Sequence, residues 1–443
     1  MTTPARRIAA EVLLRVARGG AFANLALDAA LRQAGVLEPR EAALATELTY
    51  GTLRWQLELD RALAAHSDRA FAELDEAVRV CLRLGAFELL HHAKVPPRAA
   101  VNEAVELAKE LKAGRAAGFV NAVLRRLSET RAPPPLPSRE VDPVGHVAAL
   151  TAHPRWMVER WSRWLGAAET EQLCLANQQQ AHAVVRVKRG ALAAARAALD
   201  RAGIEAVPGR WSPDALVLGS GAPPALDIEG HDEGLFQAQD EGAQLVGLYC
   251  APAPDARVLD ACAAPGGKAC QLAELAGSVL AVDLHARKAK TIAEAAKRLG
   301  LQNLQTLAAD VALPIPGVPD ESFDLVLLDA PCSGLGTLRR HPEVKLRRTP
   351  EDVDRLAQLQ SKLLAAVQRY VKPGGLLVYA LCTLTEEECD EQVDRFLAAF
   401  PQFRLDAAPA GFPPECLDAR GLLRTLTHRT GTDGFFAARL RRL

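Results

Sequence analysis

The hydrophobic residues of the first 131 positions recur at helical spacing. Typical sets are Ile8, Val12, Leu13 and Val16, and later Val78, Leu82, Phe87 and Leu89. Residues three and four positions apart share one face of a helix, so each set marks a buried face. Glycine and proline pairs such as Gly19-Gly20 and Pro96-Pro97 separate these segments. The pattern predicts an all-α bundle of six or seven helices over residues 1–131.

A proline cluster follows this helical segment. The run Ala-Pro-Pro-Pro-Leu-Pro-Ser over residues 132–138 cannot continue a helix and favours an extended connector, so we expect a linker there. Residues 139–233 then mix two kinds of pattern, which predicts a small α+β unit. The helical stretches are Pro154–Leu175 and Ala191–Ala202, and the strand-like runs are Ala183–Val187 and Ala215–Leu218.

Compact apolar strands alternate with helices over residues 234–443. The clearest strands are Val258–Asp260, Val279–Asp283, Phe323–Asp329 and Gly375–Ala380. Strands separated by helical stretches are typical of βαβ units, so this segment predicts a Rossmann-like α/β domain with a parallel sheet. The chain is therefore expected to be multidomain.

Composition narrows the class of protein only a little. The 443 residues carry 53 Lys and Arg against 54 Asp and Glu, so the net charge of −1 does not mark a nucleic-acid binder. No apolar run reaches the ~18 residues of a membrane span, and Glu11, Arg15 and Arg18 interrupt the first one, so a cytoplasmic protein is expected. The nine cysteines are scattered and form no CxxC pair, which argues against a disulfide framework and a zinc ribbon.

A glycine-containing loop follows the strand that ends at Asp260. Because ligands of doubly wound folds bind at the carboxyl ends of strands, this loop predicts a nucleoside site. It has neither the GxGxxG nor the GxxxxGK[ST] pattern, so a nucleoside carrying an amino acid, such as S-adenosylmethionine, fits better than a dinucleotide. The predicted cofactor-binding residues of the loop are Ala261, Cys262, Ala263, Ala264, Pro265, Gly266, Gly267 and Lys268.

Two aspartates lie at the ends of the next strands. Asp283 is placed to accept hydrogen bonds from ribose hydroxyls, and Asp310 to meet the adenine edge. The alternative is that either carboxylate only caps a neighbouring helix, as acidic residues at strand ends often do. Three acidic strand ends at one sheet edge favour cofactor binding.

Cys332 and Cys382 each come just after a predicted strand, at the same sheet edge as the glycine loop. A thiol at such a junction is partly exposed and can form a reactive thiolate. A free cysteine is most often a small buried residue, and no role is expected for five others. These are Cys81, Cys174, Cys250, Cys270 and Cys416.

The residues from 234 onward resemble the RNA cytosine-5 methyltransferases. The resemblance rests on Asp329-Ala-Pro-Cys332, on Cys382 after a later strand, and on the Ala-Ala-Pro-Gly-Gly-Lys loop. The segments Phe236–Asp240, Arg339–Pro342 and Leu356–Gln360 are similar to the bacterial branch that modifies small-subunit (16S) ribosomal RNA. One departure is that Ala380-Leu381 precede Cys382 where the family usually has Ser-Thr.

The N-terminal segment is similar to a NusB-like RNA-binding domain. The similarity rests on Leu48–Trp55, Ala99–Val105 and Phe119–Arg125. The expected organisation is thus an all-α NusB-like bundle at 1–131, a linker at 132–138, a small α+β RNA-binding unit at 139–233 and a Rossmann-like S-adenosylmethionine-dependent methyltransferase domain at 234–443.

The resemblance implies roles for four residues in forming 5-methylcytidine. Cytosine C5 becomes nucleophilic only after a thiolate adds at C6, and a base must later remove the C5 proton. By resemblance Cys382 is the nucleophile and Cys332 promotes product release. Asp329 would bond cytosine N3 or N4 and would also be one of the cofactor-binding residues. Lys268 would lie beside the methionine carboxylate.

The predicted partner is small-subunit ribosomal RNA, with no membrane and no metal. A basic stretch after Cys332 is expected to contact phosphates, although a merely solvated helix face is the alternative. Its residues are Arg339, Arg340, Lys345, Arg347 and Arg348. Two other functions stay open: the same chemistry on transfer RNA or large-subunit RNA, and a non-catalytic RNA-binding assembly factor.

Overall fold

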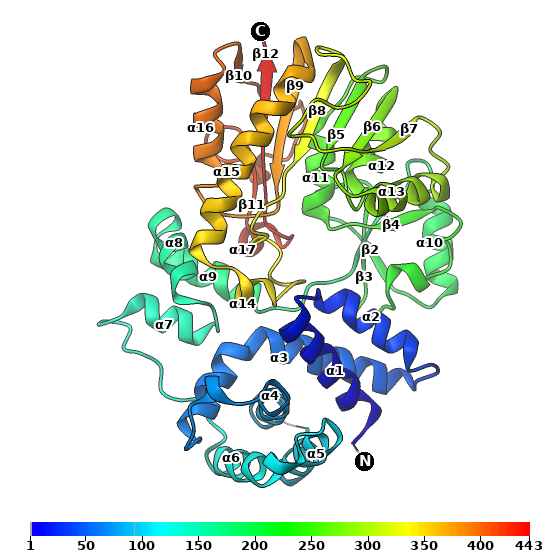
Figure 1. The fold of residues 1–443 in the computed structure, drawn as a ribbon. Coiled ribbons are helices and arrows are strands. Elements are labelled where there is room, and N and C mark those ends of the chain that lie inside the picture. The colour runs from blue at the N-terminus through cyan, green and yellow to red at the C-terminus, as the bar shows by residue number, and fades with distance from the viewer. Residues whose placement is uncertain (1, 93) are drawn as a thin grey trace. The chain divides into compact units, whose positions relative to one another are not determined.

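The structure is a computed structural model that describes residues 2–92 and 94–443 (Figure 1). The chain divides into two compact units. The helical unit contains the residues up to Gln178 together with Arg340–Arg347. The sheet unit contains Gln179–Arg339 and Arg348–Leu443. The polypeptide therefore leaves the sheet unit at Arg340 and returns to it at Arg348.

Six α-helices form the first part of the helical unit, which confirms the predicted bundle. They are α1 (Pro4–Gly19), α2 (Ala23–Gln33), α3 (Pro39–Ala65), α4 (Glu76–His91), α5 (Pro97–Glu110) and α6 (Ala117–Thr130). The helical periodicity identified the buried face correctly, since Ile8, Val12 and Leu13 are all less than 5% exposed. Asp75 begins α4 by accepting a hydrogen bond from the Ala77 amide.

Three further helices also belong to the helical unit. They are α7 (Pro143–Leu150), α8 (Arg155–Leu165) and α9 (Ala167–Asn177), and Gly166 divides the single helical stretch expected between Pro154 and Leu175. Residues 132–138 contain neither helix nor strand. After α9, Gln178 donates to the Arg54 carbonyl of α3 at 3.3 Å. Although the sequence grouped residues 139–178 with the α+β unit, these helices thus pack with the bundle.

A small antiparallel sheet begins the sheet unit. Its elements are β1 (Val184–Val187), α10 (Leu192–Arg201), β2 (Ala206–Pro208), β3 (Ala215–Leu218) and β4 (Phe236–Ala238). The strand order is β2-β3-β1-β4, and the buried side chains of Val185, Leu216 and Phe236 form its core. The predicted α+β unit is confirmed as a fold.

A large sheet and its helices make up the rest of the sheet unit. The strands are β5 (Arg257–Ala261), β6 (Ser278–Asp283), β7 (Leu304–Ala308), β8 (Phe323–Asp329), β9 (Val371–Leu381), β10 (Phe403–Leu405), β11 (Leu423–Thr425) and β12 (Phe435–Arg442). The helices are α11 (Glu241–Cys250), α12 (Gly267–Ala273), α13 (Ala286–Arg298), α15 (Pro350–Val367), α16 (Asp390–Ala399) and the short α17 (Thr427–Thr430). The remaining helix, α14 (Val344–Arg347), lies in the helical unit.

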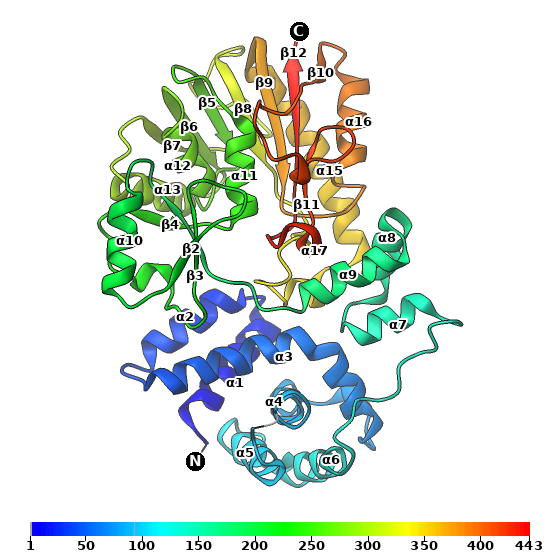
Figure 2. The same cartoon turned by 180° about the vertical axis from the view of Figure 1, so that it is seen from behind.

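Helices cover both faces of the large sheet (Figures 1 and 2). Alternate residues of β8 go to opposite faces: Val326 packs in a cluster with residues of α15 and α16, whereas Leu327 packs with residues of α11 and α12. Burial on both faces explains why β8 reads as a continuous apolar run.

The expected parallel sheet is in fact mixed. The strand order is β10-β12-β9-β8-β5-β6-β7, and the strands from β9 to β7 are parallel. β12 is antiparallel to β9, β10 and β11. Only α17 separates β11 from β12, and such a short connection cannot supply the crossover that parallel neighbours need. An apolar run such as Phe435–Leu440 carries no signal of strand direction.

Candidate functional site

Two cysteine loops meet at the carboxyl ends of β8 and β9. These strands are parallel neighbours with Asp329 opposite Ala380, so the chain segments that leave them begin side by side. Cys332 follows β8 by three residues and Cys382 follows β9 directly. Their sulfur atoms lie 3.4 Å apart, and both residues are partly exposed. The two thiols that the sequence singled out are thus brought together.

A lysine–aspartate pair lies at the same edge of the sheet. Lys268 Nζ is 2.8 Å from Asp329 Oδ2, and the ammonium group lies 5.1 Å from the centre of the Phe435 ring. Burial on its own would lower the pKa of Lys268, but the Asp329 charge and hydrogen bond outweigh it, and the pKa is raised. Lys268 therefore keeps its charge, and Asp329 is held in place beside it.

The glycine loop connects β5 to α12. Gly266 has φ +105°, and a side chain there would bring a Cβ to 3.2 Å from Ile292 on α13, so only glycine fits without strain. Cys262 also has positive φ, at 67°, and burial raises the pKa of its thiol to about 12. The loop therefore brings backbone, with little side-chain bulk, to the edge of the sheet.

Asp283 and Asp310 lie at the ends of the neighbouring strands β6 and β7. The Asp283 carboxylate accepts hydrogen bonds from the amides of His285, at 3.0 Å, and Ala264, at 3.3 Å. Asp310 is exposed and accepts from the Ala312 amide at 2.9 Å. Both carboxylates make the local backbone bonds of the capping alternative. Asp283 is also tied to the glycine loop, and their binding of a cofactor stays a prediction.

Asp260 is a site residue that the sequence reasoning missed. It is fully buried at the end of β5, and neither carboxylate oxygen has a hydrogen-bond partner among the described residues. Burial, with the nearby Asp329 charge second, raises the pKa of Asp260 well above its usual range. Such a group is stabilised by a cation or a donor that reaches it from the crevice. The sequence marked Asp260 as the acidic end of an apolar strand before the glycine loop, but we assigned it no role of its own.

Glu388 is the second residue that was missed. Its side chain is fully buried between the two cysteine loops and accepts hydrogen bonds from residues of both. The sequence showed three consecutive glutamates after Cys382 but gave no reason to separate Glu388 from its exposed neighbour Glu386.

Two glycines bring three backbone segments together beside the cysteines. Gly336 donates to the Cys382 carbonyl at 3.0 Å, and Gly434 donates to the Gly336 carbonyl at 2.7 Å. A Cβ on Gly336 would lie 2.0 Å from the Gly434 oxygen, and a Cβ on Gly434 would lie 3.0 Å from the Gly336 Cα. The Cys332 loop, the Cys382 loop and the segment before β12 thus approach one another too closely for any side chain.

The basic stretch after Cys332 is held mainly by bonds within the protein. In the helical unit, Lys345 is 2% exposed and Arg347 donates to the carbonyls of Val16, Gly20 and Ala21. In the sheet unit, Arg339 donates to the Gly431 carbonyl and Arg348 to the Ser333 carbonyl. Arg340 is partly buried. The structure gives Lys345 an interior position, and RNA contacts of this stretch stay a prediction.

The cysteines for which no role was expected are all buried. They are Cys81, Cys174, Cys250, Cys270 and Cys416. Burial raises the pKa of Cys81 and of Cys174 to about 12, so these thiols carry no reactive thiolate near neutral pH. Among the described residues no cluster of His, Cys, Asp and Glu has the arrangement of a metal site, and no helix is both long and apolar enough to cross a membrane.

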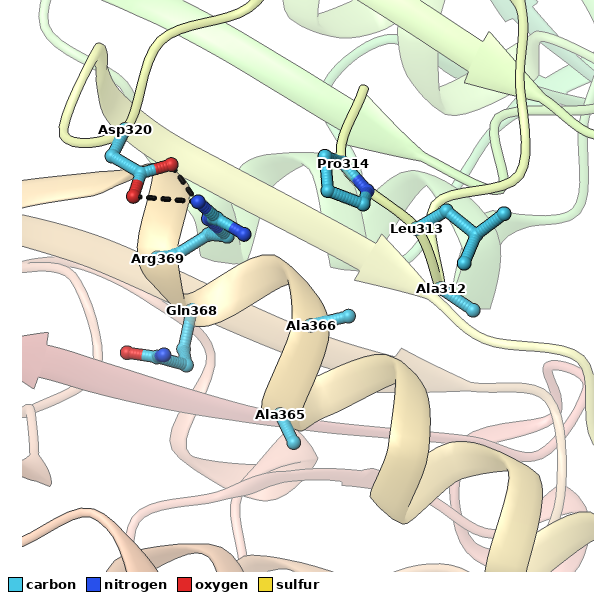
Figure 3. A pocket seen from close by; sticks show the side chains of 8 residues that line it. All are labelled: Ala312, Leu313, Pro314, Asp320, Ala365, Ala366, Gln368 and Arg369. Atoms are coloured by element: carbon cyan, nitrogen blue, oxygen red, sulfur yellow. Dashed lines mark hydrogen bonds and ion pairs between the residues drawn. The ribbon is translucent and has the colours of Figure 1, made fainter. Parts of the chain in front are cut away.

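A cavity of about 310 Å³ opens elsewhere in the sheet unit (Figure 3). It lies between α15 and the segment that follows β7, and an ion pair between Asp320 and Arg369, with bonds of 2.6 and 2.9 Å, closes one side. None of the predicted site residues is among the described residues that line it.

The fold and the site together define a Rossmann-like methyltransferase attached to a helical bundle. Family models match three segments of the chain. They are the NusB family over residues 3–129, the ferredoxin-like domain of RsmF/B-like methyltransferases over residues 153–224, and the 16S rRNA methyltransferase RsmB/F over residues 248–441.

Relatives match the whole chain. The probable ribosomal RNA small subunit methyltransferase B of Bacillus subtilis is 36% identical and covers 99% of both chains. Ribosomal RNA small subunit methyltransferase B of Pseudomonas syringae pv. tomato is also 36% identical, over 98% of this chain and 96% of the relative. The chain therefore belongs to the RsmB/F family of S-adenosylmethionine-dependent rRNA methyltransferases that carry a NusB-like domain.

Solved structures agree with the fold. The protein PH0851 has a TM-score of 0.86 and 26% identity over 100% of both chains. NSun6 from Pyrococcus horikoshii, solved with the S-adenosylmethionine analogue SFG, has a TM-score of 0.58 and 20% identity over 66% of this chain and 99% of that one.

The residues at the carboxyl ends of the strands fit S-adenosylmethionine. The unpartnered Asp260 carboxylate suits the cofactor's ammonium group, and Asp283 retains lone pairs for hydroxyl donors. Gly266 lets the loop turn with positive φ close to α13, so the loop presents backbone rather than side chains at this edge of the sheet.

Proposed function

We propose that the protein forms 5-methylcytidine in small-subunit (16S) ribosomal RNA through a covalent bond between Cys382 and cytosine C6. The observation that carries this proposal is the 3.4 Å separation of the Cys332 and Cys382 sulfurs, at the same sheet edge as the Lys268–Asp329 pair. The names of the relatives support small-subunit RNA as the substrate.

Cys382 acts as the nucleophile. Its thiolate adds to C6, and the electron pair of the C5–C6 bond makes C5 nucleophilic. Bound S-adenosylmethionine supplies the methyl group that C5 takes. Asp329 uses Oδ2 for Lys268, and its other oxygen is available for the cytosine N4 amino group. Lys268 keeps its own positive charge and holds Asp329 in position while charge develops on the pyrimidine.

Cys332 completes the reaction. The adduct loses its C5 proton to the Cys332 sulfur, the electron pair restores the C5–C6 double bond, and the bond from C6 to Cys382 breaks. The target base must leave its stack to reach both sulfurs, so the substrate cytosine is single-stranded or flipped out.

The test is methyl transfer from radiolabelled S-adenosylmethionine to unmodified 16S RNA, naked and assembled into the subunit, with the site mapped by bisulfite sequencing. Cys382→Ala is expected to abolish label at a single cytosine, and Cys332→Ala to leave a slowly migrating RNA–protein band. The control is Cys174→Ala, a buried cysteine of α9 that is expected to keep full activity. Label found only on transfer RNA or large-subunit RNA would show that this RNA, and not 16S RNA, is the substrate. Full activity of Cys382→Ala would refute the mechanism.

A further inference from the structure

Glu388 is the most completely bonded carboxylate beside the two cysteines. Its side chain has no exposed surface. One oxygen accepts from the Ser333 amide at 2.8 Å and from Gln360 at 3.0 Å. The other accepts from the hydroxyls of Ser333 at 2.5 Å, Thr385 at 2.8 Å and Thr383 at 3.3 Å. Because the Ser333 and Thr383 hydroxyls also share a hydrogen bond with each other, only one of them donates to Glu388 at a time, so four donors at once fix one buried charge.

These bonds join the two cysteine loops next to the sulfurs. Ser333 follows Cys332, Thr383 follows Cys382, and their hydroxyls are themselves 2.6 Å apart. Gln360 on α15 also donates to the Pro331 carbonyl at 2.9 Å, which fixes the chain on the other side of Cys332. Glu388 is thus the common acceptor that sets how far apart the two loops lie.

The Glu388 charge is not paired with a cation in these bonds. Its donors are hydroxyls, one amide side chain and one backbone amide, all of them neutral. A paired cation would cancel the electric field of the Glu388 carboxylate. Neutral donors hold the carboxylate in place but leave its net negative charge. A negative charge at this place opposes a second negative charge on a nearby sulfur.

Cys332 is the sulfur on which that field acts. Its hydrogen bond with Cys382 is the first cause that raises the pKa of Cys332 well above the usual value, followed by burial and by the charges of Cys382 and Glu388. The buried Tyr379 hydroxyl donates to the Glu388 backbone carbonyl at 2.8 Å, close enough to interact electrostatically with Cys332. The nearby cations are engaged elsewhere, Lys268 with Asp329 and Arg348 with the Ser333 carbonyl.

We propose that Glu388 is a positioning residue of this site, which clamps the two cysteine loops together and keeps the proton on Cys332, so that Cys382 alone serves as the thiolate. The inference rests on the proposed function for its meaning in catalysis. It accounts for how two neighbouring thiols take different roles.

The proton then follows a closed cycle. Cys332 begins as S–H and donates to the Cys382 thiolate. When Cys382 bonds C6 and C5 takes the methyl group, Cys332 loses the hydrogen bond with Cys382 and the nearby Cys382 charge, which hold its proton most strongly, and it releases the proton to water. The Cys332 thiolate, still beside Glu388, takes the C5 proton while Cys382 leaves as a thiolate. One proton is released for each methyl group transferred, and both sulfurs return to their starting state.

The test is alkylation of Cys332 by iodoacetamide in the full-length protein, followed against pH by peptide mass spectrometry. In a Cys382→Ala background, adding Glu388→Gln is expected to move the Cys332 profile to lower pH and to speed labelling about tenfold at a fixed pH, the equivalent of one pKa unit. The amide is tolerated because the surrounding hydroxyls can turn to accept from it. Glu386→Gln, an exposed neighbour, is the control and should leave the profile unchanged.

Two results would overturn the proposal. One is an unchanged Cys332 profile in the folded Glu388→Gln protein. The other needs no substitution at Glu388: in the wild-type protein Cys382 is expected to be labelled before Cys332, and the opposite order would refute the assignment. Alkylation requires neither RNA nor methyl transfer. A protein that methylates no cytosine would therefore refute the proposed function, while the labelling order still decides the role of Glu388.

Discussion

Two lysines that are largely shielded from solvent lie in opposite surroundings: the partly buried Lys268 of the sheet unit and the fully buried Lys345 of the helical unit. Lys268 has a carboxylate 2.8 Å away, and its pKa is raised. Lys345 donates to the Arg54 carbonyl at 2.8 Å and to the Gln178 side-chain oxygen at 3.4 Å, with no carboxylate among these acceptors. Burial, aided by the Arg54 charge, lowers the pKa of Lys345 to about 7.

The difference shows that the hydrogen-bond acceptor decides what a shielded lysine does. A carboxylate acceptor keeps the lysine charged, whereas neutral acceptors leave it to contribute hydrogen bonds only. Lys268 stays charged and holds Asp329 at the reaction site. Lys345 is close to losing its proton at neutral pH, and it contributes hydrogen bonds that fix the 340–347 segment within the helical unit. Only the first arrangement is useful for stabilising charge that develops on a substrate.

The largest effect is expected from removing Lys268. Lys268→Met leaves Asp329 without its cation and close to Asp260, so we expect methyl transfer to fall roughly 100-fold, as when a catalytic site loses one charged donor. The measurement is the initial rate of label transfer to 16S RNA. Lys288→Met, at an exposed position of α13, is the control and should change the rate less than twofold. A Lys268→Met rate within tenfold of wild type would contradict the role.

The second prediction concerns pH and Lys345. In the unfolded chain this lysine keeps its proton up to its ordinary pKa of 10.5, whereas the folded protein releases it near pH 7. Between these values the unfolded state binds more protons, so the free energy of unfolding rises with pH, by up to about 1.4 kcal/mol per pH unit. Below pH 7 both states are protonated and this contribution is constant.

The measurement for Lys345 is urea unfolding at pH 7 and pH 9, compared with Lys345→Met. Wild type should gain stability over the variant between the two pH values, because the other groups contribute equally to both proteins. At pH 7 itself Lys345→Met is expected to be about neutral, since an apolar side chain of similar size replaces a costly buried amine. Parallel pH profiles would refute the low pKa.

The smallest effect is expected at Arg340, in the same basic stretch. If that stretch contacts RNA phosphates, Arg340→Ala should reduce the slope of log affinity against log salt by about one, while buried Lys345→Met should leave the slope unchanged. Filter binding to 16S RNA between low and moderate salt measures both. Equal slopes for wild type and Arg340→Ala would show that Arg340 does not contact an RNA phosphate.

Much of the fold was predictable because burial leaves a periodic pattern. The helical spacing around Ile8 and Val12 predicted the bundle, and apolar strands ending at Asp283 and Asp329 predicted which residues share one sheet edge. Strand direction was not predictable, because β12 is buried on both faces like a parallel strand.

The roles of individual charged residues were harder to predict. Lys345 lies in a run of basic residues, a pattern typical of a solvent-exposed surface. Only the tertiary packing shows that its side chain is buried. Asp260 and Glu388 gain their importance from groups that lie far away along the chain, such as Ser333 and Gln360 for Glu388. Sequence spacing alone carries no record of such contacts.

The contact between Gly336 and Gly434 bears on how freely this site can change. The two cysteine loops and the approach to β12 are joined there by backbone atoms, at 2.7 Å from the Gly434 amide to the Gly336 carbonyl. Every amino acid except proline has the same backbone amide and carbonyl groups, so most surrounding side chains can be exchanged by mutation without weakening this contact. Substitution is not tolerated at the two glycines themselves. Even the smallest side chain there would separate the cysteine loops from the segment that leads into β12.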